Sequence, residues 1–293
     1  MRTIYLCDNT LEGILCGVYD AWSSRKGHDN VKLELCNQER NIELFTEYEE
    51  VTTEQWKADK LVLSIRKKIS EAAYEAVYKA SLSKEPERAD RIYRFLIYGF
   101  HIGSGVTDML QIPAVFDIFT ICRHLDHEVH LLTGFVRFAE MENPSLAENN
   151  SAAISSAVIG SGEIVEQRSY LQRAGSANSL LVSKIGPKND VLVLLAPHFA
   201  DRLSGENWII YDEKRKKAVL HPSNRSWFLM TLDSPEWEDY LLKAASQDQY
   251  EELWKIFRKS ITIKERVNPT CQLNHMPLRY RPYMTEFDHS LKD

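Results

Sequence analysis

The C-terminal stretch of the chain, Tyr250–Phe287, carries the side chains whose types and spacing best fit contact with a polyanion. Cationic residues gather there although the net charge of the whole chain is −6, and aromatic residues lie between them. Guanidinium groups bind phosphate oxygens through paired hydrogen bonds, and aromatic rings stack on unpaired bases. The cationic residues include Arg258, Lys259, Lys264, Arg266, His275, Arg279 and Arg281.

The end of this stretch admits two interpretations. Arg279, Tyr280, Arg281 and Tyr283 alternate after Pro277, which predicts an extended segment with both arginines on one side and Tyr280 on the other. In one interpretation the arginines contact the phosphates of a nucleic acid. In the other they form salt bridges to carboxylates of their own domain and fasten the tail across it. The spacing alone leaves both open.

A second candidate for chemistry is the stretch that contains His198 and Arg202. The two residues are four positions apart, so a helix presents both on one side, ahead of a predicted strand that carries Tyr211 and Asp212. Together they would form an anion site, or an enzyme site on nucleic acid or nucleotides with Asp212. The alternative is structural: Arg202 bonds the carbonyls at its helix end, Trp208 fills the core and Asp212 accepts hydrogen bonds in a turn.

The histidines and cysteines do not match known metal sites. His124, His127 and His130 recur every three residues, which differs from the H-E-x-x-H spacing of zinc proteases, and Cys271 with His275 lacks a second ligand pair. The chain contains no P-loop, no G-x-G-x-x-G and no G-x-S-x-G. We therefore expect no metal and no cofactor, and the residues identify no reaction.

The elements that must position these residues begin with a helix-rich N-terminal lobe, residues 1–133. Short strands are predicted at 4–7, 31–35 and 44–51, and Thr10 is a plausible N-cap of the first helix. A long helix is predicted from Thr53 to Ala76. Two further helices are predicted to start at Pro86 and Pro113.

A second lobe, residues 134–293, is predicted to be an antiparallel sheet covered by helices, which makes the whole chain α+β. Gly134 is expected to end a helix, and the residues that follow it to form a strand. The Ser/Ala-rich stretch 143–177 predicts a mobile insertion. In the last helix, 249–264, one apolar stripe is expected to be buried. The remaining predicted elements are strands at 135–138, 180–185, 207–211, 218–221 and 227–232, and helices at 190–203 and 235–245.

Composition limits the setting of the protein. The 293 residues are 44% hydrophobic, enough for one large or two modest domains, and no run of apolar residues is long enough for a membrane span. Five scattered cysteines without a C-x-x-C pair disfavour a disulfide framework, so we expect a cytoplasmic protein. The acidic balance means that nucleic acid would bind only at a local basic patch.

Several motifs, taken in order, resemble a bacterial family of DNA metabolism or DNA repair proteins. They are YLCDNTLEGILCGVYDAW near the N-terminus, GFVRF at 134–138, LLAPHFADRLSGENWIIYDEKR at 194–215, IKERVNP at 263–269 and HMPLRYRPYMTEF at 275–287. The resemblance spans nearly the whole chain. The insertion at 143–177 is longer than the family normally shows.

The resemblance implies a setting but no established activity. Members of that family are encoded beside a radical-SAM DNA repair protein, and the domain also occurs fused to uracil-DNA-glycosylase-like domains. It therefore implies an accessory protein that binds DNA or a repair enzyme, or else a pure interaction scaffold for the radical-SAM partner. The family's distinctive positions fall on Arg137, His198, Arg202, Trp208, Tyr211, Asp212, Lys264, Arg266, His275, Arg279, Tyr280 and Arg281.

Overall fold

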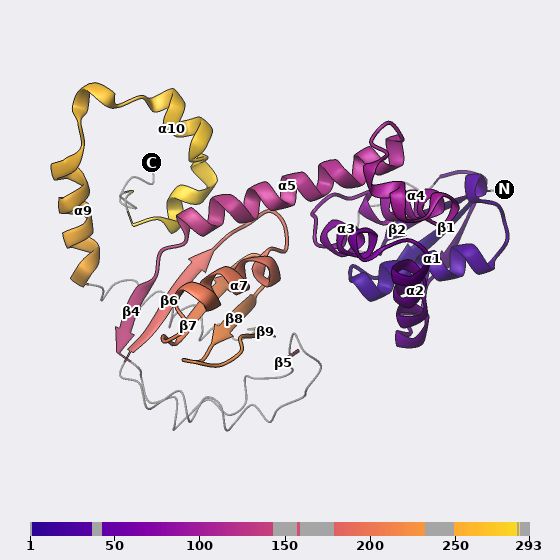
Figure 1. The fold of residues 1–293 in the computed structure, drawn as a ribbon, viewed down its shortest axis with the longest axis horizontal. Coiled ribbons are helices and arrows are strands. Elements are labelled where there is room, and N and C mark those ends of the chain that lie inside the picture. Colours follow the sequence, from indigo (N-terminus) through magenta and orange to yellow (C-terminus); the bar gives the residue numbers. More distant parts are fainter. Residues whose placement is uncertain are drawn as a thin grey trace. The chain divides into compact units, whose positions relative to one another are not determined.

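The computed structural model describes residues 2–36, 43–142, 157–158, 179–231, 249–285 and 287. The chain divides into two compact units, Met1–His127 (unit 1) and Glu128–Asp293 (unit 2). Its class is α+β, as predicted, with a separate sheet in each unit (Figure 1). The predicted helix at 235–245 and nearly all of the predicted insertion at 143–177 lie outside the described residues.

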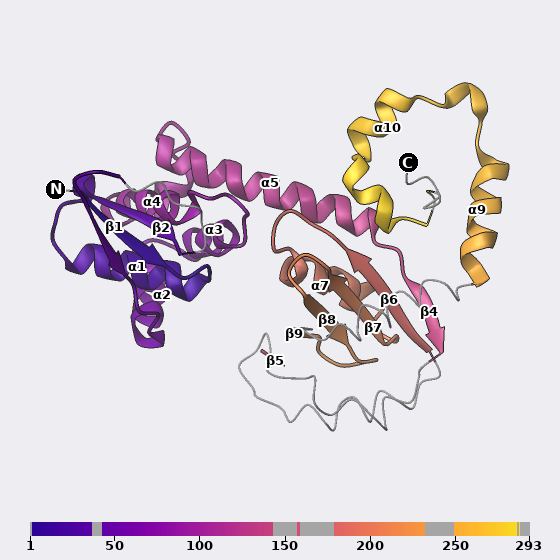
Figure 2. The ribbon, with the colours of Figure 1, turned by 180° about the vertical axis from the view of Figure 1, so that it is seen from behind.

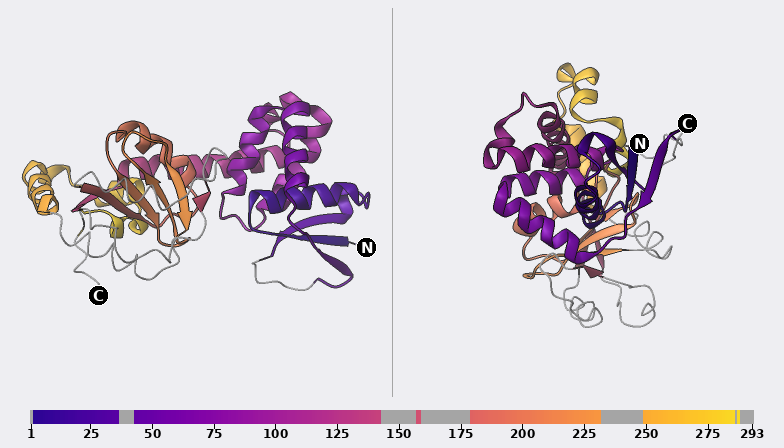
Figure 3. Two further views of the ribbon diagram at one scale, coloured as in Figure 1. Left: turned by 90° about the horizontal axis from the view of Figure 1, so that it is seen from below. Right: turned by 90° about the vertical axis from the view of Figure 1, so that its right-hand side faces the viewer.

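Unit 1 is built on a small parallel sheet in the order β2-β1-β3. The central strand β1 is buried along Thr3–Cys7, and β2 alternates buried and half-buried residues, as the period-two sequence pattern predicts. Figure 3 shows the helices of this unit gathered on one side of the sheet. The elements are β1 (Arg2–Cys7), α1 (Leu11–Ser23), η1 (His28–Asn30), β2 (Val31–Leu35), β3 (Thr46–Glu50), α2 (Gln55–Lys68), α3 (Glu71–Ser81), α4 (Arg88–Ile102), η2 (Ser104–Asp108) and most of α5 (Pro113–Phe135).

Local capping residues set the helix boundaries in unit 1. Thr10 caps α1 by accepting a hydrogen bond from the Gly13 amide at 3.0 Å, as predicted. The single helix predicted from Thr53 to Ala76 is wrong, because the Ser70 hydroxyl caps a new helix, α3, by accepting from the Ala73 amide at 3.1 Å. Gly103, with φ of +85°, ends α4, a conformation that glycine adopts without strain.

Unit 2 contains a six-stranded sheet in the order β4-β6-β7-β8-β9-β5. The sheet is mixed rather than fully antiparallel, because α7 connects β6 to β7 as a crossover and the two strands run parallel. The hairpin β7–β8 is antiparallel, as predicted. Figures 1 and 2, seen from opposite sides, show α7 against one face of the sheet. The elements are β4 (Ala139–Glu142), β5 (Ala157–Val158), β6 (Ser179–Ile185), α7 (Leu192–Arg202), β7 (Trp208–Asp212), β8 (Lys217–His221) and β9 (Phe228–Thr231).

The segment around Gly134 differs from the prediction. Helix α5 continues through Gly134 to Phe135, and Gly134 does not have a positive φ. The following strand, β4, starts only at Ala139 rather than at Phe135. The Arg137 side chain explains the delayed end of the helix, because its Nη1 donates to the carbonyls of Gly134 at 2.7 Å and Val136 at 3.2 Å.

The C-terminal part of unit 2 is helical rather than extended. It comprises α9 (Gln249–Ile261), η3 (Lys264–Arg266), α10 (Pro269–His275) and η4 (Leu278–Tyr283). The Asn268 side chain caps α10 by accepting from the Cys271 amide at 3.0 Å. Within the described ranges, no helix combines the length and the apolar character needed to cross a membrane.

Candidate functional site

The apolar stripe of α9 is exposed, so the prediction that it is buried is wrong. Exposed fractions are 61% for Leu253, 42% for Trp254, 51% for Phe257 and 59% for Ile261. The side chain of Tyr250 lies outside the described part. The spacing of the apolar residues predicts a helix with one apolar face, but it does not predict whether that face is buried. Helices that pack on a core and helices that bind a partner share this spacing.

Two arginines from different elements lie against one aromatic ring. The guanidinium carbon of Arg258, in α9, lies 5.6 Å from the centre of the Phe287 ring, and that of Arg281, in η4, lies 4.7 Å from it. The Arg281 Nε atom is buried and has no hydrogen-bond acceptor within the described part of the chain. The two positive charges are therefore concentrated at one place, with one donor still unsatisfied.

Arg279 and Tyr280 bind a carboxylate of their own unit, as in the interpretation in which the tail is held by its own domain. The Tyr280 side chain is buried, and its hydroxyl donates to Glu128 Oε1 at 3.0 Å while it accepts from Arg279 Nη2 at 2.6 Å. Arg279 also lies 3.6 Å from Glu128 Oε1. These contacts account for Tyr280 and for Arg279 Nη2 without a ligand, whereas Arg279 Nε is buried and has no hydrogen-bond partner within the described part of the chain. They do not involve Arg281.

Glu128 is the buried carboxylate on which this tail is anchored. It accepts hydrogen bonds from the Lys188 amide at 2.9 Å, from the Asn189 amide at 3.0 Å and from the Asn189 side chain at 2.6 Å. Burial by itself would raise the pKa of Glu128, but these donors with Tyr280 and Arg279 hold it below its ordinary value. Burial raises the pKa of Tyr280 to about 12, so its hydroxyl stays protonated as a donor.

The structure does not present His198, Arg202 and Asp212 together as a reactive group. His198 and Arg202 are exposed on α7, whereas Asp212 is fully buried. Asp212 accepts from the Lys214 amide at 3.0 Å and from Arg215 Nη1 at 2.7 Å, as the turn interpretation predicts. Burial raises the pKa of Asp212, and Arg215 opposes that rise. Tyr211 is buried in the sheet beside Asp212.

The remaining predicted site residues lie on other elements or next to the end of α5. Arg137 covers the end of α5, and exposed Arg266 and His275 lie in η3 and at the end of α10. Lys264 begins η3, but its side chain is outside the described part. Among the residues described, no three His, Cys, Asp or Glu side chains gather as metal ligands.

Sequence reasoning missed two cavities. One of about 540 Å³ lies in unit 1 and is described below. One of about 440 Å³ lies in unit 2 beside the end of α7, where His221 stacks on Trp208 at 5.0 Å between ring centres. His198 and Arg202 are not among the described residues that line it. No sequence motif marks either cavity, because the lining residues come from separate elements.

The comparisons with known proteins identify a family but no activity. No curated protein matches the chain. The family model described as "Domain of unknown function (DUF4130)" matches residues 86–156 and 164–286, which together exceed half of the chain and include parts of both units. The matched stretches contain all of the site residues predicted from the sequence, but not Phe287. The chain therefore belongs to this family, the domain of unknown function DUF4130.

Proposed function

We propose that the protein is an accessory protein of DNA repair or DNA metabolism that binds nucleic acid through its C-terminal segment. We call the segment from α9 to η4, with Phe287, the basic arm. The observation that carries the proposal is the convergence of Arg258 and Arg281 on the Phe287 ring. The two guanidinium carbons are no more than about 10 Å apart, about one Debye length at roughly 0.1 M salt, so their fields add at a phosphate between them.

The unsatisfied Arg281 Nε supports an anionic ligand. A buried donor without an acceptor costs free energy, and a phosphate oxygen would supply the missing acceptor. Arg279 contributes little charge to this surface because Glu128 lies 3.6 Å from its Nη2, although its Nε is also buried without a partner among the described residues. The proposed contacts with DNA are therefore Arg258 and Arg281, with exposed Arg266 and His275 as further cations on the same arm.

The aromatic residues of α9 favour single-stranded or unpaired DNA. Trp254 and Arg258 are four residues apart and share one side of the helix, and the Trp254 ring lies 5.8 Å from that of Phe257. Both rings are about half exposed. A base stacked on an aromatic side chain contributes about 1–3 kcal/mol, with little preference for sequence. The net charge of −6 repels DNA elsewhere, so binding depends on this local arm.

The test is a fluorescence-anisotropy titration of the full chain with single-stranded and double-stranded DNA. We expect the affinity to fall steeply between about 50 and 200 mM salt, because phosphate binding releases counterions. The double variant Arg258→Ala with Arg281→Ala should bind at least tenfold more weakly. It should also make the slope of log K against log salt less steep by about 1.4 for single-stranded DNA, because each of the two lost phosphate contacts contributes about 0.7.

The matched control removes two exposed cations outside the arm, Lys67 and Arg123, by substitution with Ala. It changes the net charge by the same amount, and it should bind DNA almost as well as the natural chain. An absence of binding at low salt, or an equal loss of affinity in the control, would exclude the proposal.

The resemblance also supplies the proposed setting. We propose that the protein acts in the cytoplasm, with a radical-SAM repair protein or a uracil-DNA-glycosylase-like protein as partner. All five cysteines carry free thiols, which supports a reducing compartment. The exposed apolar residues of α9 support a second candidate, a scaffold that binds the radical-SAM protein without DNA. That candidate predicts co-purification of the two proteins, lost on Leu253→Asp, and no affinity for DNA.

A further inference from the structure

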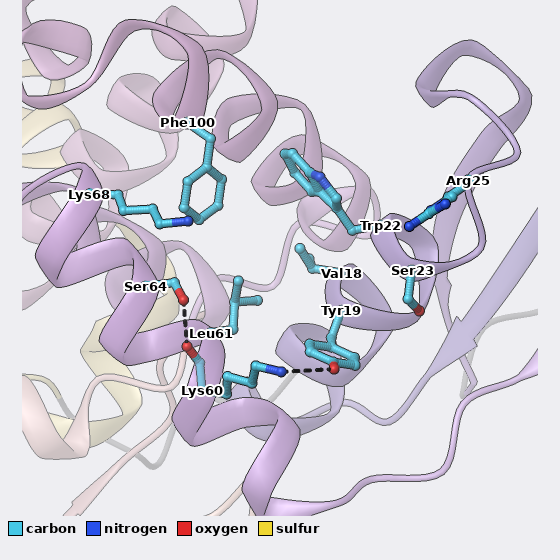
Figure 4. A pocket seen from close by; sticks show the side chains of 10 residues that line it. All are labelled: Val18, Tyr19, Trp22, Ser23, Arg25, Lys60, Leu61, Ser64, Lys68 and Phe100. Atoms are coloured by element: carbon cyan, nitrogen blue, oxygen red, sulfur yellow. Dashed lines mark hydrogen bonds between the residues drawn. The ribbon is translucent and has the colours of Figure 1, made fainter.

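A cavity of about 540 Å³ lies among three helices of unit 1 and combines cationic with aromatic side chains. Figure 4 shows Lys60 and Lys68 extending from α2, and Arg25 on the other side, beyond Trp22. Its volume falls in the range of about 300–1,000 Å³ typical of small-molecule sites. The cationic and aromatic lining residues are Tyr19 and Trp22 of α1, Arg25 after it, Lys60 and Lys68 of α2, and Phe100 of α4.

The positive charge of this cavity is not neutralised by neighbouring carboxylates. None of the described lining residues is acidic. Asp20, next to Tyr19, pairs with Lys57 at 3.1 Å, and Glu71 pairs with Arg66 at 3.0 Å. Within the described residues, Arg25 and Lys68 form no ion pair. Lys60 donates only to the Tyr19 hydroxyl, at 3.3 Å.

Helix ends do not account for this charge. Lys68 lies in the last turn of α2, and Ser23 and Phe100 lie near the ends of α1 and α4. The C-terminus of a helix carries about −0.5 of an elementary charge. Three such ends would offset only about half of the charge of three cations, so an anion would be bound favourably.

The aromatic side chains are held in place before any ligand binds. The Trp22 ring meets the Phe100 ring edge-on at 5.3 Å and the His28 ring at 4.7 Å. The Tyr19 ring is held by Trp56 at 5.4 Å and by the Lys60 ammonium at 5.3 Å. Rings fixed in this way lose little conformational entropy when a planar group stacks on them.

We propose that this cavity binds a nucleotide, with the phosphate held by Arg25, Lys60 or Lys68 and the base against Trp22 and Phe100. Aliphatic anions would use only the cations, and a neutral aromatic only the rings. A base that carries a phosphate uses both. The shared chemistry is found in a free mononucleotide and in the 5′-phosphorylated end of a nucleic acid. The site lies outside the basic arm, so it does not depend on the proposed function.

The test is calorimetric titration of the full chain with AMP and with a 5′-phosphorylated oligonucleotide. Adenosine and ribose 5-phosphate are the ligand controls, because each lacks one half of the recognised chemistry. We expect both to bind at least tenfold more weakly than AMP. The variant Arg25→Asn with Lys68→Gln should weaken AMP binding by about tenfold or more, from the loss of charge-assisted hydrogen bonds. Asn suits position 25 because Arg25 has a φ of +54°.

The matched control is Lys67→Gln with Arg123→Gln, which removes two exposed cations that do not line the cavity. A second measurement needs no variant: AMP should slow acetylation of Lys68 but not of the adjacent Lys67. Binding of the oligonucleotide without AMP, weakened by Arg25→Asn with Lys68→Gln, would assign the site to nucleic-acid ends, and binding of AMP would assign it to free nucleotides. Equal binding of AMP and adenosine, or equal loss in the control variant, would overturn the proposal.

The two proposals fail separately. Arg258→Ala with Arg281→Ala should leave AMP binding unchanged, and Arg25→Asn with Lys68→Gln should leave the salt dependence of long single-stranded DNA unchanged. No saturable binding of AMP at millimolar concentration, together with equal binding of the 5′-phosphorylated and the unphosphorylated oligonucleotide, would reject the nucleotide site but not the basic arm.

Discussion

Glu128 shows how one buried carboxylate fixes the end of the chain. Its side chain is 3% exposed, and it is contacted from two separate segments, Lys188–Asn189 and Arg279–Tyr280. A buried charge is tolerated only when its oxygens are well satisfied, and breaking such a network costs more than forming it gains. The tail is therefore attached to α5 by a network in which each partner depends on the others.

We predict that Glu128→Gln lowers the free energy of unfolding by about 1–3 kcal/mol at neutral pH. The pKa of Glu128 in the folded chain lies below its ordinary value, so the carboxylate stabilises the fold above the ordinary pKa. This contribution is lost as the pH falls through the lowered pKa. Urea unfolding at several pH values should show the natural chain and the variant converging in acid.

The control for this prediction is Glu140→Gln, which neutralises an exposed carboxylate in β4 of the same unit. It should change the free energy of unfolding by no more than about 0.5 kcal/mol. A constant difference between the natural chain and Glu128→Gln across the acid range would contradict the assigned pKa direction.

At the residue scale, sequence reasoning succeeds where the partners are local. The turn contacts of Asp212 and the burial of Trp208 follow from a strand that ends in a turn. The role of Glu128 was not predicted, because its partners lie 60 and 152 positions along the chain. Its sequence neighbours, His127 and Asp126, are exposed and gave no sign of burial.

At the element scale, η4 packs against the end of β6 at a glycine. A Cβ atom added to Gly186 would collide with the Tyr283 ring, and the Tyr283 hydroxyl donates to Glu213. Gly186 therefore permits a close approach that a larger residue would prevent. The Tyr283 contact holds the C-terminal end of η4, whereas the Glu128 network holds Arg279 and Tyr280 near its start.

We predict that Gly186→Ala displaces Tyr283 and destabilises unit 2 by about 1–3 kcal/mol through overpacking. Gly205→Ala is the matched control, because nothing lies within 4 Å of a Cβ atom there. Urea unfolding gives the free energies, and limited tryptic proteolysis after Arg279 reports release of η4. Equal protease resistance of the two variants would show that this contact does not hold the tail.

The elements themselves were largely predictable, and the errors have identifiable causes. Periodicity and N-cap residues predicted β1, α1, β2, α5 and the β7–β8 hairpin. The helix α10 was missed although Asn268–Pro269 is an N-cap followed by Pro at the first helical position. The helix predicted between β6 and β7 is typical of a connection between parallel strands. The prediction of an antiparallel sheet did not take this helix into account. The exposure of α9 depends on tertiary contacts that no local pattern contains.

At the scale of the whole molecule, charge is distributed unevenly. The net charge is −6, yet cations that form no ion pair among the described residues occur in the unit 1 cavity and on the basic arm of unit 2. The matched family segments begin at residue 86, so of the residues that line the cavity they include only Phe100. The basic arm lies within the match almost to its end. The two proposed anion-binding surfaces thus differ in their relation to the family.

The five thiols, which occur in both units, provide a test of the whole structure. Cys271 is exposed, whereas Cys7 and Cys16 lie in the core of unit 1. Burial raises the pKa of Cys7 and Cys16, and it raises the pKa of Cys122 to about 11. Only a thiolate reacts rapidly with an alkylating reagent. We predict that iodoacetamide at about pH 8 modifies Cys271 much faster than Cys7, Cys16 or Cys122 in the native chain.

Unfolding in urea should then expose Cys7 and Cys16 together. Their side chains share one core, in which a Cβ atom added to Gly17 would collide with Cys7 Sγ, so neither can open while the other stays packed. Mass spectrometry after a short pulse of reagent gives the urea midpoint for each thiol. Coincident midpoints for the two cysteines are expected from one cooperative core. Labelling of Cys7 or Cys16 in the native chain at the rate of Cys271, or midpoints that differ, would mean that unit 1 lacks this core.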